Sequence, residues 1–168
     1  MLKRILAVVT VVAVLAVPAG AATAAPSKNI VETAAAAPQF STLVSLVKKA
    51  GLVKALSGKT KLTVFAPTNA AFEKVPKKTL NMLLDDRKLL RKVLLYHVVA
   101  GKLPASKVVK RSGAETLEGE RVSFAVKGQK VFVNQARVIT PDIRAGNGII
   151  HGIDAVLIPA SLNGEGAR

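Results

Sequence analysis

Apolar residues in the first half of the chain recur at the spacing of an α-helix. In segment 85–96 they form one stripe, made of Leu89, Leu90, Val93, Leu94 and His97. Asp85 and Asp86 stand at the start of this segment, where acidic side chains interact favourably with a helix dipole. A second stripe runs over 38–50 and stops at Gly51, a residue suited to the end of a helix. The pattern predicts two amphipathic helices over these segments.

Shorter elements are predicted around these two helices. Asn29 and Glu32 have the spacing of a capping box, so we expect a helix from there to about Ala37. The apolar run 61–66 is closed by Pro67 and predicts a strand. Further short helices are expected over 52–56, 70–74 and 76–84.

The pattern changes after Gly101, where short alternating runs replace the helical spacing. Segments 121–127 and 130–134 flank Gly128-Gln129, an arrangement typical of a β-hairpin. Further strands are expected over 137–140 and 149–158. Because helices come first and antiparallel strands later, we predict an α+β domain rather than repeated βαβ units.

The segment between the last two predicted strands is expected to lie outside the sheet. Pro141 has no N–H to donate to a strand ladder, and Gly146-Asn147-Gly148 follows closely. We therefore predict that Asp142 and Ile143 form an exposed loop. The glycines that follow are expected to make a turn with positive φ.

The N-terminus has the pattern of a secretory signal peptide. Lys3 and Arg4 precede an apolar run over 5–17, which is shorter than the ~20 residues that span a bilayer. Ala22-Thr23-Ala24 then fits a cleavage site after Ala24. We expect a leader over 1–24, one domain over 25–160 and a short polar tail over 161–168. The mature protein would be secreted, extracellular or periplasmic, without a transmembrane segment; an uncleaved anchor is the alternative.

The chain is strongly basic and lacks cysteine. It contains 25 Lys and Arg against 10 Asp and Glu, a formal net charge of +15. The lack of cysteine excludes disulfides, thiol catalysis and cysteine-ligated zinc. The positive field attracts polyanions, or serves solubility alone. Specific nucleic-acid binding is not expected, because the chain has one Tyr and no Trp to stack on bases.

Candidate catalytic and metal-binding residues are few. The two histidines are His97, on the inward stripe, and His151, inside an apolar run. His151 and Asp154 are three residues apart, so on a strand they lie on opposite faces and cannot hold one metal ion together. The serines lack a Gly-x-Ser-x-Gly motif. We therefore predict that both histidines are structural and that the protein has no catalytic, metal or cofactor site.

The outer face of the predicted helix 85–96 carries a cationic patch. Its members are Arg87, Lys88, Arg91 and Lys92. Residues four apart on a helix are neighbours, so these side chains form one compact group. No acidic residue follows at matching spacing within the same helix. The patch is either a solvated face or a docking face for an anionic surface polymer.

Several segments together resemble the fasciclin-like domain family. The strongest are Thr63-Val-Phe-Ala-Pro-Thr-Asn-Ala-Ala-Phe72, Leu94-Leu-Tyr-His-Val-Val99 and Asn147-Gly-Ile-Ile-His-Gly-Ile-Asp-Ala-Val-Leu-Ile-Pro159. Segments 29–33 and 40–43 fit the opening helices of that family. The resemblance implies a wedge of antiparallel strands packed against several α-helices, and a non-enzymatic extracellular role in adhesion or matrix contact. The leader and the one-domain length are typical of a bacterial member.

The resemblance also implies candidate adhesion residues. In animal relatives, integrin binding has been attributed to a Pro-Asp-Ile segment and to the Tyr-His region. The matching residues here are Asp142 and Ile143, after Pro141, together with Tyr96 and His97. Arg144 stands where those relatives carry an apolar residue, and Asn69 stands where many members have Asp.

Three functional hypotheses follow. The first is a secreted adhesion module that binds an extracellular protein, a glycan or an anionic surface polymer. The second is a basic cell-envelope protein that binds polyanions through charge alone, which a salt titration would distinguish. The third, an enzyme or small-ligand binder, would require a deep pocket with convergent polar groups.

Overall fold

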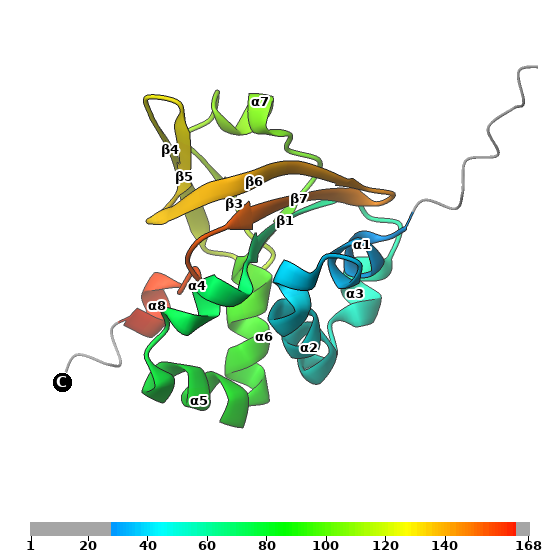
Figure 1. Ribbon diagram of the computed structural model, residues 1–168, viewed down its shortest axis with the longest axis vertical. Coiled ribbons are helices and arrows are strands. Elements are labelled where there is room, and N and C mark those ends of the chain that lie inside the picture. The colour runs from blue at the N-terminus through cyan, green and yellow to red at the C-terminus, as the bar shows by residue number, and fades with distance from the viewer. Residues whose placement is uncertain (1–27, 164–168) are drawn as a thin grey trace, which may run out of the picture.

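The computed structural model describes residues 28–163, and the predicted leader 1–24 lies outside them. Helices fill most of the first half of the described chain (Figure 1). They are α1 (Ile30–Ala35), the 3₁₀ turn η1 (Pro38–Phe40), α2 (Ser41–Ala50), α3 (Val53–Ser57), α4 (Asn69–Glu73), α5 (Lys77–Asp85), α6 (Arg87–Tyr96), α7 (Ala105–Val108) and α8 (Ala160–Asn163). The strands are β1 (Leu62–Pro67), β2 (Val98–Ala100), β3 (Gly113–Glu115), β4 (Arg121–Lys127), β5 (Lys130–Val133), β6 (Ala136–Ala145) and β7 (Gly148–Ile153).

The helix ends are held by the local signals that the sequence contains. Asn29 and Glu32 form the predicted capping box at α1. Helix α2 ends at Gly51, whose φ of 71° is left-handed. The side chain of Asp86 accepts from two backbone N–H groups at the start of α6, whereas Asp85 is the last residue of α5. These predictions are confirmed to within one or two residues.

The strands of residues 28–163 form one sheet in the order β2-β1-β7-β6-β5-β4-β3. Most neighbours are antiparallel, including the predicted hairpin of β4 and β5. Strand β1, however, runs parallel to β7 over six residue pairs. The α+β prediction is confirmed, but the purely antiparallel wedge is corrected to a mixed sheet. Both central strands are buried along their whole length, which is typical of strands covered on both faces.

Two hydrophobic clusters lie on opposite sides of the central strands. One lies beneath α1, α2 and α6 and contains Phe40, Leu90 and Ile150. The other contains Phe65, Tyr96 and Val133 and lies under β4 and β5. Figure 1 shows α1 to α6 gathered on one side of the sheet and α7 on the other. The domain thus has a helical side and a side formed mainly by strands.

The turn between β6 and β7 differs from the prediction of positive φ. Among the described glycines, neither Gly146 nor Gly148 has positive φ. A side chain at Gly148 would collide with the backbone carbonyl oxygen of Leu62, so the close approach of β1 requires glycine there. Asn147 is buried between them and accepts from Ile30 N through Oδ1 at 2.8 Å. The motif therefore anchors α1 to the sheet.

Candidate functional site

The segment that carries Asp142 is a β-bulge inside β6. The register between β6 and β7 passes from Thr140↔Gly152 to Ile143↔Ile150. Pro141 and Asp142 therefore stand opposite the single residue His151. A bulge accommodates proline, because one residue there has no partner in the ladder. The prediction of a loop outside the sheet was wrong, since β6 continues through this segment to Ala145.

Asp142 links the bulge to two other segments. Its φ of 55° is left-handed, a conformation that Asp tolerates better than most residues. Its backbone N–H donates to His151 Nδ1 at 3.1 Å. Its carboxylate Oδ1 accepts from Ala105 N, the first residue of α7, at 2.8 Å. The side chain is exposed, yet it caps a helix.

Ile143 lies next to Asp142 and is half-buried. Its side chain packs against the hydrophobic cluster beneath the helices. Only part of this side chain could contact a partner. Of the two predicted adhesion residues in the bulge, Asp142 is the more exposed.

His151 is held from both sides of its ring. It is 1% exposed and stacks on Phe65, with the ring centroids 5.5 Å apart. Nδ1 accepts from Asp142 N, and Nε2 donates to the carbonyl oxygen of Leu103 at 2.7 Å. A neutral ring with its proton on Nε2 satisfies both hydrogen bonds. Burial lowers the pKa of His151, and the nearby Asp142 charge opposes this shift.

His97 forms a similar link at the end of α6. It is 1% exposed; Nδ1 donates to Val93 O at 2.8 Å, and Nε2 accepts from Leu157 N at 2.9 Å. Burial lowers the pKa of His97 to about 4, despite the opposing hydrogen bond to Val93. The prediction that both histidines belong to the core is confirmed by their burial and by their backbone partners.

Tyr96 is buried beside His97. Its hydroxyl donates to Arg121 O at 3.4 Å and accepts from Asn134 Nδ2 at 2.9 Å. Neither Tyr96 nor His97 offers a side chain to a partner at the surface. Both side chains instead hold neighbouring segments, Tyr96 through Arg121 O in β4 and His97 through Leu157 N after β7.

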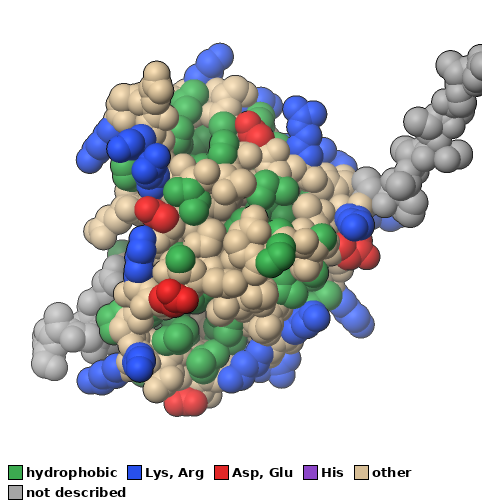
Figure 2. All heavy atoms as spheres, viewed as in Figure 1, with side chains coloured by type: hydrophobic (Ala, Val, Ile, Leu, Met, Phe, Trp, Pro, Cys, Tyr) green, Lys and Arg blue, Asp and Glu red, His purple; other side chains and the backbone are tan. Residues whose placement is uncertain are grey.

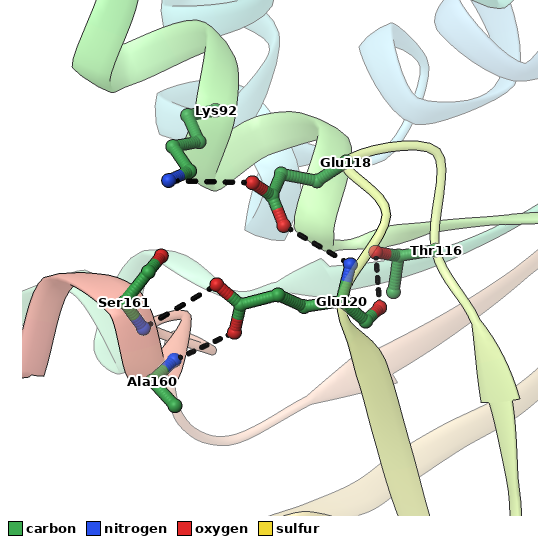
Figure 3. Close-up of polar contacts among 6 residues, drawn as sticks. All are labelled: Lys92, Thr116, Glu118, Glu120, Ala160 and Ser161. Atoms are coloured by element: carbon green, nitrogen blue, oxygen red, sulfur yellow. Dashed lines mark hydrogen bonds and ion pairs between the residues drawn. The ribbon is translucent and has the colours of Figure 1, made fainter.

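The cationic patch on α6 is divided by its tertiary contacts. Lys92 Nζ lies 3.5 Å from Glu118 Oε1 in the β3–β4 connection (Figure 3). The guanidinium of Arg87 lies over Gly51, at the end of α2, where a positive charge is favourable. No ion pair within residues 28–163 involves Lys88 or Arg91. These two residues are exposed members of the patch for which no such tertiary contact is seen, whereas Arg87 is exposed but lies over Gly51.

The β3–β4 connection has a role that the sequence pattern does not indicate. Glu120 accepts from Ala160 N and Ser161 N at the start of α8, as Figure 3 shows. Hydrogen bonding to the Ser161 side chain, and then to the backbone N–H groups of Ser161 and Ala160, lowers the pKa of the Glu120 carboxyl group. Helix α8 also includes the first residues of the segment predicted as a polar tail. The only sequence signal was a cluster of three glutamates, which does not indicate a partner 40 residues away.

Acidic side chains in the described chain mostly bind backbone N–H groups rather than cations. Those that accept from backbone N–H are Glu32, Asp86, Glu118, Glu120, Asp142 and Asp154. Two ion pairs occur within residues 28–163, and each involves one lysine. Most Lys and Arg side chains of this range therefore form no ion pair, and Figure 2 shows Lys and Arg side chains spread over the visible face.

The cavity beside His151 is small and mainly apolar. It has a volume of about 110 Å³ and is lined in part by Phe65, Val108 and Val138. No group of three His, Asp or Glu side chains among residues 28–163 could hold a metal ion. In the same range, the helices lack the length and apolar character needed to cross a membrane.

Comparisons with known proteins agree with this fold. The family model of the Fasciclin domain matches residues 38–159. The chain is 50% identical over 134 residues to protein sll1483 of Synechocystis, covering 78% of this chain and 73% of that protein. It is 36% identical over 127 residues to the cell surface glycolipoprotein MPB83 of Mycobacterium bovis, covering 73% of this chain and 56% of MPB83.

A solved structure of a FAS1 domain pair from the insect cell adhesion molecule Fasciclin I also superimposes on the chain. The TM-score is 0.66 at 18% identity, over 81% of this chain and 52% of the other. This match shows a shared fold, and the family model covers most of the described residues. The chain belongs to the Fasciclin domain family, which includes adhesion-related proteins.

Proposed function

We propose that this protein is an exported, non-enzymatic adhesion module that binds a component of the cell surface or extracellular matrix. The observation that carries the proposal is membership of the Fasciclin domain family over residues 38–159. MPB83 is described as a cell surface protein, and Fasciclin I as a cell adhesion molecule. A domain with this fold and a leader-like N-terminus fits the same setting.

The chemistry of the histidines supports a binding role rather than a catalytic one. Each ring is buried, and each of its two nitrogens binds a backbone group. Neither ring has a nitrogen left to take a proton from a substrate, because both positions are occupied. The other side chains that line the cavity beside His151 are mainly apolar.

Asp142 is the residue of the bulge best placed to contact a partner. Its side chain is exposed at the surface, although one carboxylate oxygen caps α7. Asp142→Asn keeps an oxygen that can accept from Ala105 N, and Asn also tolerates left-handed φ. This substitution therefore removes the charge while it preserves the fold, which makes it the variant of choice for an adhesion test.

The proposal is tested by attachment of the purified protein to a surface fraction from its own source. The wild-type protein should be retained, and a protein of equal size and charge from another fold should not. Asp142→Asn should reduce retention if the bulge is the contact. No retention of the wild-type protein would reject the adhesion function, whereas equal retention of both forms would reject only the bulge.

A second candidate function is the binding of polyanions by charge alone. It is favoured by the unpaired cations of the described chain, since the acidic side chains are engaged with backbone N–H groups. Attraction between exposed charges is screened by salt, with a Debye length of ~8 Å at physiological ionic strength. Retention that disappears at moderate salt would favour this function, and retention that persists would favour specific adhesion.

A further inference from the structure

The outer face of the β4–β5–β6 sheet carries exposed cations. Successive side chains on a strand point to opposite faces, and on these strands one set is buried. Val122, Phe124 and Val133 point into the core. The alternate positions point outward and include Lys127, Lys130, Phe132, Arg137 and Ile139. We call these five residues the β-face.

The strand register places the members of the β-face next to one another. Lys127 stands opposite Lys130, and Phe132 stands opposite Arg137. Neighbouring strands lie ~4.8 Å apart, so the cations form a compact group. Figure 2 shows Lys and Arg side chains gathered over the β4–β5 hairpin at the upper left, with hydrophobic side chains beside them.

Strands β4, β5 and β6 contain one acidic residue, Asp142, whose carboxylate accepts from Ala105 N. Two more acidic residues stand beside these strands. Glu115 is opposite Arg121 at the β3 edge, and Asp154 binds the backbone N–H of Arg137 at the other edge. Neither of the two ion pairs within residues 28–163 includes Lys127, Lys130 or Arg137. The group therefore keeps its positive charge, unlike the α6 patch, where Glu118 pairs with Lys92.

The apolar members give the β-face a second property. Lys127 Nζ lies 5.6 Å from the centre of the Phe132 ring, which is half-buried. Ile139 is 45% exposed, although isoleucine is usually buried. The surface thus offers apolar contact beside Lys127 and Arg137, because Phe132 lies next to both.

We propose that the β-face docks an acidic polysaccharide. This inference rests on the proposed function, to which it adds a surface and a partner class. An extended glycan is itself a row of anionic groups and apolar ring faces, which matches cations interleaved with Phe132 and Ile139. A bilayer is a poorer match, because Phe132 is half-buried and Lys127 Nζ lies over its ring, which leaves Ile139 as the one exposed apolar side chain of the β-face. A single-stranded nucleic acid is also a poorer match, because successive bases stack on several aromatic side chains and the β-face has one.

The test compares two variants of the full protein that lose the same charge. In the β-face variant, Lys127→Gln, Lys130→Gln and Arg137→Gln are combined. In the matched control, Arg87→Gln, Lys88→Gln and Arg91→Gln are combined on α6. All six side chains are exposed, so both variants should keep the wild-type circular dichroism and melting temperature. The probes are polygalacturonate and an uncharged galactan of similar length.

The wild-type protein should bind polygalacturonate and not the uncharged galactan. The β-face variant should lose about tenfold in affinity, and the α6 control much less, because only the first removes the proposed contacts. Equal losses in the two variants would overturn the proposal and leave net charge as the cause. A β-face variant that binds polygalacturonate like the wild-type protein would overturn it too.

Two further arms separate this inference from the proposed function. Stronger binding to vesicles that contain anionic lipid than to polygalacturonate would overturn the partner class. A wild-type protein that attaches to its surface fraction but not to polygalacturonate would overturn the docking surface alone. A wild-type protein that attaches to neither would reject the adhesion function as well.

As a single-site check, Phe132→Leu should weaken binding to polygalacturonate without any change in charge.

Discussion

His97 and His151 join distant parts of the chain in similar ways but in different surroundings. His97 binds Val93 and Leu157, and all of its contacts lie inside the domain. His151 binds Leu103 and the backbone of Asp142, a residue whose side chain reaches the surface. The first link connects α6 to the segment after β7, and the second connects β7 to the bulge and to α7. Buried hydrogen bonds thus hold the fold at one site and shape a surface at the other.

The largest effect is expected from His97→Ala. The substitution leaves Leu157 N and Val93 O buried without partners and opens a cavity. Each unsatisfied buried group costs ~1–3 kcal/mol, so the free energy of unfolding should fall by about 4 kcal/mol. Urea unfolding measures this change. A loss below about 1 kcal/mol would contradict the role assigned to His97.

A pH titration should give the next largest effect. The pKa of His97 is about 4 in the folded chain and 6.5 ordinarily, so the unfolded chain binds the proton more tightly. The contribution of the neutral His97 ring to the free energy of unfolding is fully present above about pH 6.5 and is lost as the pH falls towards 4. The loss is about 3 kcal/mol, because one unit of pKa corresponds to 1.36 kcal/mol.

The control for this titration is His97→Gln, which does not titrate in this range. The difference in stability between wild type and His97→Gln should shrink as the pH falls from 6.5 to 4. Carboxyl groups and His151 contribute equally to both proteins and cancel in the comparison. A constant difference over this range would show that His97 is not buried as a neutral ring.

Substitution of Asp142 should have an intermediate effect. Asp142→Ala removes the cap of α7 and places alanine at a φ of 55°, so we expect a loss of about 2 kcal/mol. This differs from the near-zero effect that an exposed loop would imply. Asp142→Asn should cost less than about 0.7 kcal/mol, since it keeps the acceptor and the conformation. Thermal melts of both variants test this order, and a reversal would argue against the cap.

The smallest effect is expected at the ion pair between Lys92 and Glu118. The two charged atoms are 3.5 Å apart; the lysine side chain is 38% exposed and the glutamate side chain 10%. Because the lysine is open to water, the pair should contribute little more than the ~0.2–1 kcal/mol of exposed ion pairs. A double-mutant cycle with Lys92→Gln and Glu118→Gln should give a coupling of about 0.5 kcal/mol that decreases with salt. A coupling above about 2 kcal/mol would mean that the α6 patch is structural.

The helices and the hairpin could be predicted because their signals are local. The capping box of Asn29 and Glu32, the end of α2 at Gly51 and the alternation in β4 each depend on a few neighbouring residues. The burial of His97 followed from its position on the stripe of α6. Strands β2 and β3 were not predicted because each has three residues, too few for a period to be visible.

The candidate site could be predicted in its residues but not in its geometry. Pro141 and Asp142 were identified through a resemblance, yet a proline followed closely by Gly146 and Gly148 favoured a loop. The bulge depends on register with β7, which places His151 where it can accept from Asp142 N. The pairing of Glu118 with Lys92 and the capping of α8 by Glu120 likewise join elements that the sequence does not connect.

By itself, the sequence determined the α+β class, the family, the basic charge and the inward direction of both histidines, since these depend on composition, local periodicity and motifs. The tertiary structure decided the parallel pairing of β1 with β7, the bulge at Asp142 and the division of the α6 patch. It also decided that acidic side chains cap backbone groups and leave the β-face positive. These features depend on which distant segments come into contact, and that is set by the packing of the whole domain rather than by any local pattern.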